Sequence, residues 1–190
     1  MKKVVFWLLV FFFVSVNTAP HALARPDSQI TDFSLVVEKG RMRTSFFVQG
    51  CFSPEIEEAV ESGIPATLTL TLRLYKYRTL WKDKRLATVE ATRKIQYDTI
   101  KKEYQIFLQD TERPVVVKYL WKAKQVISWV EDLAMTLPSP LQPGVTYDVR
   151  VKAAMEPAKL PFRLESLLFF LSSPGHCETD WYIKRFRITE

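Results

Sequence analysis

Apolar and polar residues alternate most regularly between residues 66 and 77. Leu68, Leu70, Leu72 and Leu74 are separated from one another by threonine or arginine. A period of two is typical of a β-strand with one face buried. Weaker alternation or enrichment in strand-forming residues predicts further strands at residues 86–97, 103–109, 146–154 and 180–189.

Two segments near the start of the regular pattern predict a β-hairpin. Residues 30–38 and 41–49 are both rich in β-branched and aromatic residues, and Lys39-Gly40 separates them. A short connection that contains glycine favours a tight turn between antiparallel strands.

The next segment has the signals of a short helix. Ser53 is suited to cap the N-terminus, and Pro54 is suited to the first helical position. Gly63 can adopt the left-handed conformation that ends a helix, so the helix is expected to end at about Ser62.

A second, longer helix is expected over residues 119–135, because apolar residues recur there at helical spacing. The stripe consists of Leu120, Ala123, Val126, Ile127, Val130 and Ala134. Trp121 and Trp129 of this segment are expected to pack in the core; the alternative is that they mark a membrane-surface helix, with Lys122 and Lys124 near them. The apolar residues 164–171 predict one or two further helical turns that cover the sheet.

These elements give about seven strands and two or three helices without a βαβ rhythm. The pattern predicts an α+β fold, a mainly antiparallel sheet or sandwich with helices packed on it. No repeat or linker divides residues 25–190, so a single β-rich domain is expected there.

The first 24 residues have the organisation of a signal peptide. Two lysines precede a largely apolar run at residues 4–16, and Ala22-Leu23-Ala24 supplies small residues at −3 and −1. We therefore expect cleavage between Ala24 and Arg25, with an uncleaved anchor as the alternative. Such a protein is exported across the inner membrane and is periplasmic or envelope-associated, and residues 25–190 contain no expected transmembrane span.

Composition argues against most catalytic chemistry. The 190 residues carry a net charge of +6, with 47% hydrophobic and 25% charged residues, as in an ordinary globular protein. Only His176 remains after cleavage, and no spacing of Cys51, His176 and Cys177 resembles a metal site. Glycine-rich phosphate loops are also absent from the sequence. We expect no cofactor and no enzymatic activity; a hydrolase that uses His176 is the weakest alternative.

The two cysteines have a structural use in an oxidising compartment. Cys51 follows the second predicted strand, and Cys177 precedes the last one. If these strand ends meet, the cysteines can form a disulfide; otherwise they are two separate buried thiols.

Positive charge is concentrated in one segment. Residues 73–102 contain ten basic and three acidic residues, a net charge of +7, within one long predicted hairpin. Tyr75, Tyr77 and Trp81 are expected at its tip. Basic residues interleaved with aromatic rings suit an anionic partner, although lysines and arginines can also simply solvate a sheet edge. The candidate partner-binding residues are Lys76, Arg78, Trp81, Lys82, Lys84, Arg85, Arg93 and Lys94.

Several short motifs occur in a recognisable order. They are Glu61-Ser62-Gly63-Ile64-Pro65, Trp81 with Leu86-Ala87, Tyr97 with Glu103-Tyr104, Leu160-Pro161-Phe162-Arg163-Leu164, and Trp181. Their order and spacing resemble an uncharacterised bacterial family, domain of unknown function family 4390. The resemblance covers about residues 30–188 and implies an exported protein of this length, with no assigned activity.

The leading function hypothesis is a non-enzymatic envelope protein whose basic hairpin binds an anionic membrane surface or an acidic envelope protein. Nucleic acid is not expected as a partner, because an exported protein meets little of it. The alternative is a small apolar-ligand binder, with a cavity between the apolar face of the sheet and the helix around Val126.

Overall fold

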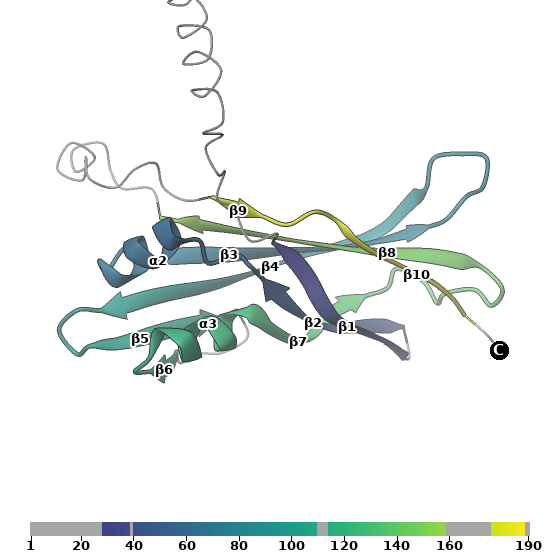
Figure 1. Ribbon diagram of the computed structural model, residues 1–190. Helices are drawn as coiled ribbons and strands as arrows, with labels where there is room; N and C mark the ends of the chain where they lie inside the picture. Colours follow the sequence, from purple (N-terminus) through teal and green to yellow (C-terminus); the bar gives the residue numbers. More distant parts are fainter. Residues whose placement is uncertain (1–27, 39, 110–113, 159–175, 189–190) are drawn as a thin grey trace, which may run out of the picture.

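The computed structural model describes residues 28–38, 40–109, 114–158 and 176–188. The predicted signal peptide and the predicted helical turns at residues 164–171 lie outside these ranges. Within them the chain forms ten strands and two helices, and all strand pairs are antiparallel (Figure 1). The predicted fold class, a mainly antiparallel α+β structure, is confirmed.

The larger sheet has seven strands. Six follow the order β10-β8-β3-β4-β5-β6, and β9 pairs with β8. The strands are β3 (Ala66–Lys76), β4 (Lys84–Asp98), β5 (Glu103–Leu108), β6 (Val115–Val117), β8 (Thr146–Pro157), β9 (Cys177–Glu178) and β10 (Tyr182–Arg187). Figure 1 shows β3, β4 and β8 running along the molecule as its longest elements.

Strand β3 lies at the centre of this sheet and confirms the alternation seen in the sequence. It pairs with β4 on one side and β8 on the other along its whole length. Its four leucines are at most 1% exposed, whereas the intervening threonines and Arg73 are only half-buried. The leucine face of β3 therefore forms one side of the hydrophobic core.

A smaller sheet packs on part of this leucine face. It consists of β1 (Gln29–Glu38), β2 (Arg41–Gln49) and β7 (Trp129–Thr136), in the order β1-β2-β7. The predicted hairpin of the first two strands is confirmed by their pairing. Buried Met42 and Phe46 of β2 belong to the same core as the β3 leucines. Phe33 of β1 meets Tyr182 of β10 with ring centroids 5.0 Å apart, which links the two sheets.

Helix α2 (Pro54–Glu61) forms as the sequence predicts. The Ser53 hydroxyl accepts a hydrogen bond from the Ile56 N–H at 3.4 Å. At the other end, Gly63 has a φ of +86° and donates its N–H to the Val60 carbonyl. These contacts satisfy backbone groups that a helix leaves unpaired at its ends.

The prediction of one helix over residues 119–135 is wrong in its second half. Helix α3 (Leu120–Ser128) ends at Ser128, and β7 begins at the next residue. Here the chain forms a strand, because β7 pairs with β2 at the edge of the smaller sheet. Val130 and Met135 of β7 are buried. Short apolar runs fit either period, so a distant strand partner decides between them.

The expected burial of both tryptophans in this segment is also wrong. Trp121 is 65% exposed and Trp129 is 44% exposed. Ala123 and Ile127 take the buried positions of α3 instead.

Candidate functional site

The predicted basic hairpin corresponds to strands β3 and β4. Residues 76–85, which we call the hairpin end, include the last residue of β3, the turn and the first residues of β4. Figure 1 shows the turn as an open loop at the end of the sheet opposite α2. Leu80 is 95% exposed and Trp81 is 77% exposed in this turn. Two large apolar side chains are thus presented to solvent in succession.

Cations surround these two side chains. Within the described residues none of the five basic side chains of the hairpin end forms an ion pair: Lys76, Arg78, Lys82, Lys84 and Arg85. The single acid, Asp83, accepts a hydrogen bond from the Arg78 N–H at 3.3 Å and pairs with Arg150 of β8. Five basic residues and one acidic residue give the hairpin end a net charge of +4.

Strands β8 and β10 bring further charges to the same end of the sheet. Arg185 of β10 lies opposite Asp148 of β8 and donates hydrogen bonds to both of its carboxylate oxygens, at 2.8 and 3.1 Å. These hydrogen bonds hold the pKa of the 1% exposed Asp148 carboxyl below its usual value, against the opposing effect of burial. Sequence reasoning missed Arg185 because about 100 residues separate it from the hairpin end; only the strand order brings the two together.

Two of the three aromatic residues expected at the tip are covered instead. The Arg150 guanidinium carbon lies 4.2 Å from the centroid of the Tyr75 ring, and the Arg185 guanidinium carbon lies 3.8 Å from that of Tyr77. Both rings contribute to packing on the outer face of the sheet through cation–π contacts. Trp81 is therefore the aromatic residue of this group that the turn presents to a partner.

The structure separates two of the predicted partner-binding residues from the others. Arg93 and Lys94 lie eight and nine residues beyond Arg85 along β4, on the order of 26–30 Å away. The Arg93 Nη1 donates to carbonyls of Val126, Ile127 and Trp129 at the end of α3. Lys94 lies with its Nζ 5.7 Å from the centroid of the Phe107 ring. Arg93 thus stabilises the C-terminus of a helix, where a cation is favourable.

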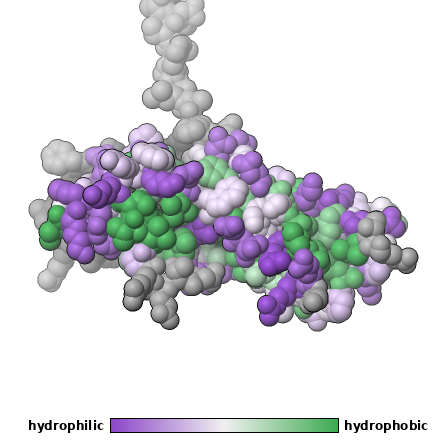
Figure 2. Space-filling view, turned by 90° about the horizontal axis from the view of Figure 1, so that it is seen from below, coloured by the Kyte–Doolittle hydropathy of each residue, from purple (hydrophilic) through white to green (hydrophobic). Residues whose placement is uncertain are grey.

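A second candidate site is a groove of about 640 Å³, at the place where the sequence suggested a cavity. Helix α3 and β7 lie on one side of it, and β4 and β5 lie on the other. Its apolar lining includes Leu70, Ala91, Leu108, Val126, Val130 and Leu133. Figure 2 shows hydrophobic side chains gathered at the end of the molecule where α3, β5 and β6 lie.

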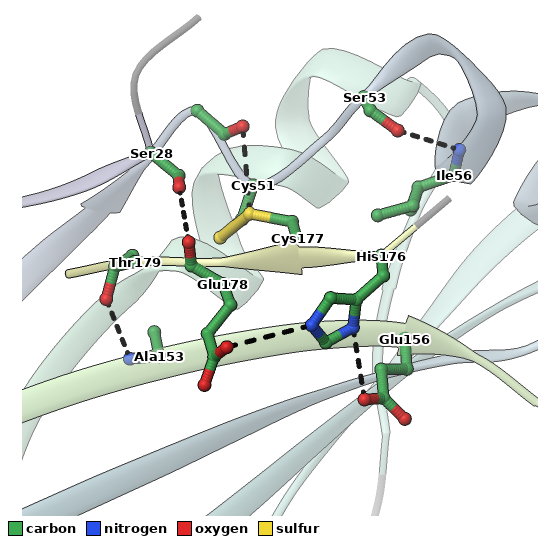
Figure 3. Close-up of a disulfide and its surroundings, with 11 residues drawn as sticks. Ser28, Cys51, Ser53, Ile56, Ala153, Glu156, His176, Cys177, Glu178 and Thr179 are labelled. Carbon is green, nitrogen blue, oxygen red and sulfur yellow. Dashed lines mark hydrogen bonds and ion pairs between the residues drawn. A yellow bond between two sulfur atoms is a disulfide. The ribbon is translucent and has the colours of Figure 1, made fainter. Parts of the chain in front are cut away.

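The predicted disulfide between Cys51 and Cys177 is present, with the two Cα atoms 5.3 Å apart (Figure 3). Cys51 follows β2 of the smaller sheet, and Cys177 begins β9 of the larger sheet. Hydrogen bonds between Ala153 and Thr179, in both directions, hold the chain after β9 against β8. The bond therefore joins the two sheets covalently.

His176 lies beside this disulfide and, among the described residues, its ring faces two carboxylates (Figure 3). Its Nδ1 is 3.1 Å from a carboxylate oxygen of Glu156, and its Nε2 is 3.9 Å from one of Glu178. The neighbouring sulfur of Cys177 is committed to the disulfide. Among the described residues, no cluster of three histidine, cysteine or acidic side chains is placed to hold a metal ion.

A comparison with protein-family models identifies the family of this chain. The model of a domain of unknown function, DUF4390, matches residues 25–184. The chain belongs to the DUF4390 family. The matched range of the DUF4390 domain includes the hairpin end, the groove and both cysteines. No curated protein and no solved structure matches the chain. None of the helices in the described part is long and apolar enough to span a membrane.

Proposed function

We propose that the protein is a non-enzymatic, exported envelope protein that binds an anionic phospholipid surface through the hairpin end. The observation that carries the proposal is the exposure of Leu80 and Trp81 in a turn with a net charge of +4. Aromatic and aliphatic side chains insert at the level of lipid headgroups, while flanking lysines and arginines contact anionic headgroups.

The free energy of membrane binding can be estimated from the basic residues and Leu80. Each lysine or arginine close to an anionic membrane contributes about 1 kcal/mol, so five contribute about 5 kcal/mol. Burial of Leu80 adds about 1.5 kcal/mol or more. A total near 7 kcal/mol corresponds to a dissociation constant of about 10 µM, a reversible attachment.

The proposal favours lipid over nucleic acid as the partner, because an exported protein meets anionic lipid and little nucleic acid. The proposal takes residues 1–24 as an export signal and residues 25–190 as a single periplasmic or envelope-associated domain. The absence of catalysis in the proposal rests on the environment of His176, which faces two carboxylates next to a disulfide.

Co-sedimentation with vesicles tests the proposal. The protein should sediment with vesicles that contain phosphatidylglycerol and remain in solution with pure phosphatidylcholine. The variant Lys82→Glu/Lys84→Glu/Arg85→Glu should lose binding at least tenfold. The matched control is Lys94→Glu/Lys101→Glu/Lys102→Glu, which makes the same charge change outside the hairpin end and should bind nearly as the parent does.

A second variant separates lipid insertion from simple charge attraction. Leu80→Ser/Trp81→Ser leaves the charge unchanged and should also weaken binding. If it binds as tightly as the parent while the triple charge reversal does not, the vesicles are held by charge attraction alone, and the proposed insertion of Leu80 and Trp81 fails. Equal losses in the two triple variants, or no binding by the parent protein, would refute the membrane proposal.

A further inference from the structure

We infer that the groove beside α3 binds a single-chain amphiphile with an anionic head, such as a fatty acid. The groove volume of about 640 Å³ lies within the range of small-molecule sites. Ala91, Leu108, Val126 and Leu133 remain only half-buried along its walls. An apolar occupant would remove this surface from water.

One face of α3 gives the groove its direction. Lys122, Gln125 and Val126 line it, and their spacing of three and four residues places them along one side of the helix; Trp129, directly after the helix, lines it too. The wall thus begins at a cation and ends at the 44% exposed indole of Trp129, where β7 continues with Val130. A linear molecule with a polar head and an apolar tail matches this sequence of side chains.

Lys122 is the cation suited to an anionic head. Its Nζ donates to the Gln125 amide oxygen at 2.8 Å, and it forms no ion pair within the described residues. Arg93, by contrast, is committed to the carbonyls at the end of α3. The acid that lines the groove, Glu131, lies on β7.

An extended peptide fits the same space less well. A peptide that adds to a strand needs free main-chain donors and acceptors. On the β4 side of the groove, the Thr92 N–H already donates to the Gln109 side chain at 2.9 Å. The groove therefore suits a ligand that makes apolar contacts and one contact with a cation better than it suits a peptide that pairs through its main chain.

Displacement of a fluorescent fatty acid tests the inference without vesicles. The probe is 11-(dansylamino)undecanoic acid, and the competitors are palmitate, lysophosphatidylglycerol and the neutral hexadecanol. Lys122→Glu should weaken palmitate binding about fivefold, the scale of one exposed charge pair. The matched control Lys118→Glu changes the charge of an exposed lysine that does not line the groove, and it should change binding less than twofold.

A filled groove provides the second test. Val126→Trp should abolish probe binding, and circular dichroism shows whether this variant keeps its fold; if it does not, the two lysine variants still decide. The hairpin-end variant Lys82→Glu/Lys84→Glu/Arg85→Glu should bind palmitate as the parent does, so this inference and the membrane proposal can fail separately.

Each result of the displacement assay either supports or overturns the inference. Displacement by palmitate supports a fatty acid, and displacement by lysophosphatidylglycerol alone supports a phospholipid as the source of the same chemistry. No saturable probe binding by the parent protein overturns the inference. Equal effects of Lys122→Glu and Lys118→Glu, or displacement by hexadecanol that matches palmitate in every variant, also overturn it.

Discussion

Removal of the Cys51–Cys177 bond should destabilise the protein strongly. The two cysteines are 126 residues apart in the chain, and both are buried, at 2% and 8% exposure. The bond ties the chain after β2 to β9, which pairs with β8 through only two residues. Short strands of this kind contribute little pairing energy of their own, so the covalent link carries much of the attachment.

The loop length sets the magnitude. In the chain-entropy account, closing a loop of this length removes unfolded-state entropy worth about 5 kcal/mol at 25 °C. For a protein of this size, each kcal/mol changes the melting temperature by about 2–4 °C. The variant Cys51→Ala/Cys177→Ala should therefore melt about 10–20 °C below the oxidised parent.

Urea denaturation followed by tryptophan fluorescence measures the effect. Parent protein kept reduced retains both sulfur atoms in the core, so it separates the loss of the cross-link from the loss of side-chain packing. We expect the reduced parent to show most of the destabilisation and the double alanine variant slightly more. A reduced parent less than 1 kcal/mol below the oxidised protein would refute the reasoning that the bond acts through the unfolded chain.

Two further predictions concern one partly buried and one buried charge. Arg93→Met leaves the carbonyls at the end of α3 without their charged donor, and it should lower the free energy of unfolding in urea by about 2–3 kcal/mol; a loss below 0.5 kcal/mol would contradict the capping role. The lowered pKa of Asp148 means that its charge stabilises the fold above the unfolded pKa of about 3.9, and that this stability is lost as the pH falls through the lower folded pKa. Thermal unfolding of Asp148→Asn, which is destabilised at pH 7, should therefore depend less on pH between about 4 and 2 than that of the parent, and parallel curves would show that Asp148 is not the group responsible.

Local signals predicted the elements whose stability is local. The leucines of β3 alternate because one face is buried, and Ser53 and Gly63 mark both ends of α2 with chemistry that acts within four residues. The junction of α3 and β7 has no such marker. Val130 and Ala134 continue the helix stripe of α3 along the chain, but pairing with β2, more than 80 residues earlier, makes this segment a strand.

The candidate site, too, could be predicted from the sequence only in part. The excess of basic residues is visible along the chain, but which of them share a surface depends on strand direction and register. Arg93 points to the core side of β4 and reaches α3, whereas Arg185 arrives at the hairpin end from the last strand. Trp121 is exposed because it lies off the buried face of α3, and Trp129 directly follows the end of α3 at Ser128, which no residue type signals.

The disulfide also makes the stretch between its two cysteines a covalent ring. The hairpin end and the lining residues of the groove lie within that ring, whereas β1, β2 and β10 lie on the tails outside it. A protease that cuts the exposed turn at Lys82 would open the ring without dividing the molecule, and the two pieces would separate only after reduction. A single cut in this exposed turn thus leaves both pieces joined by the disulfide.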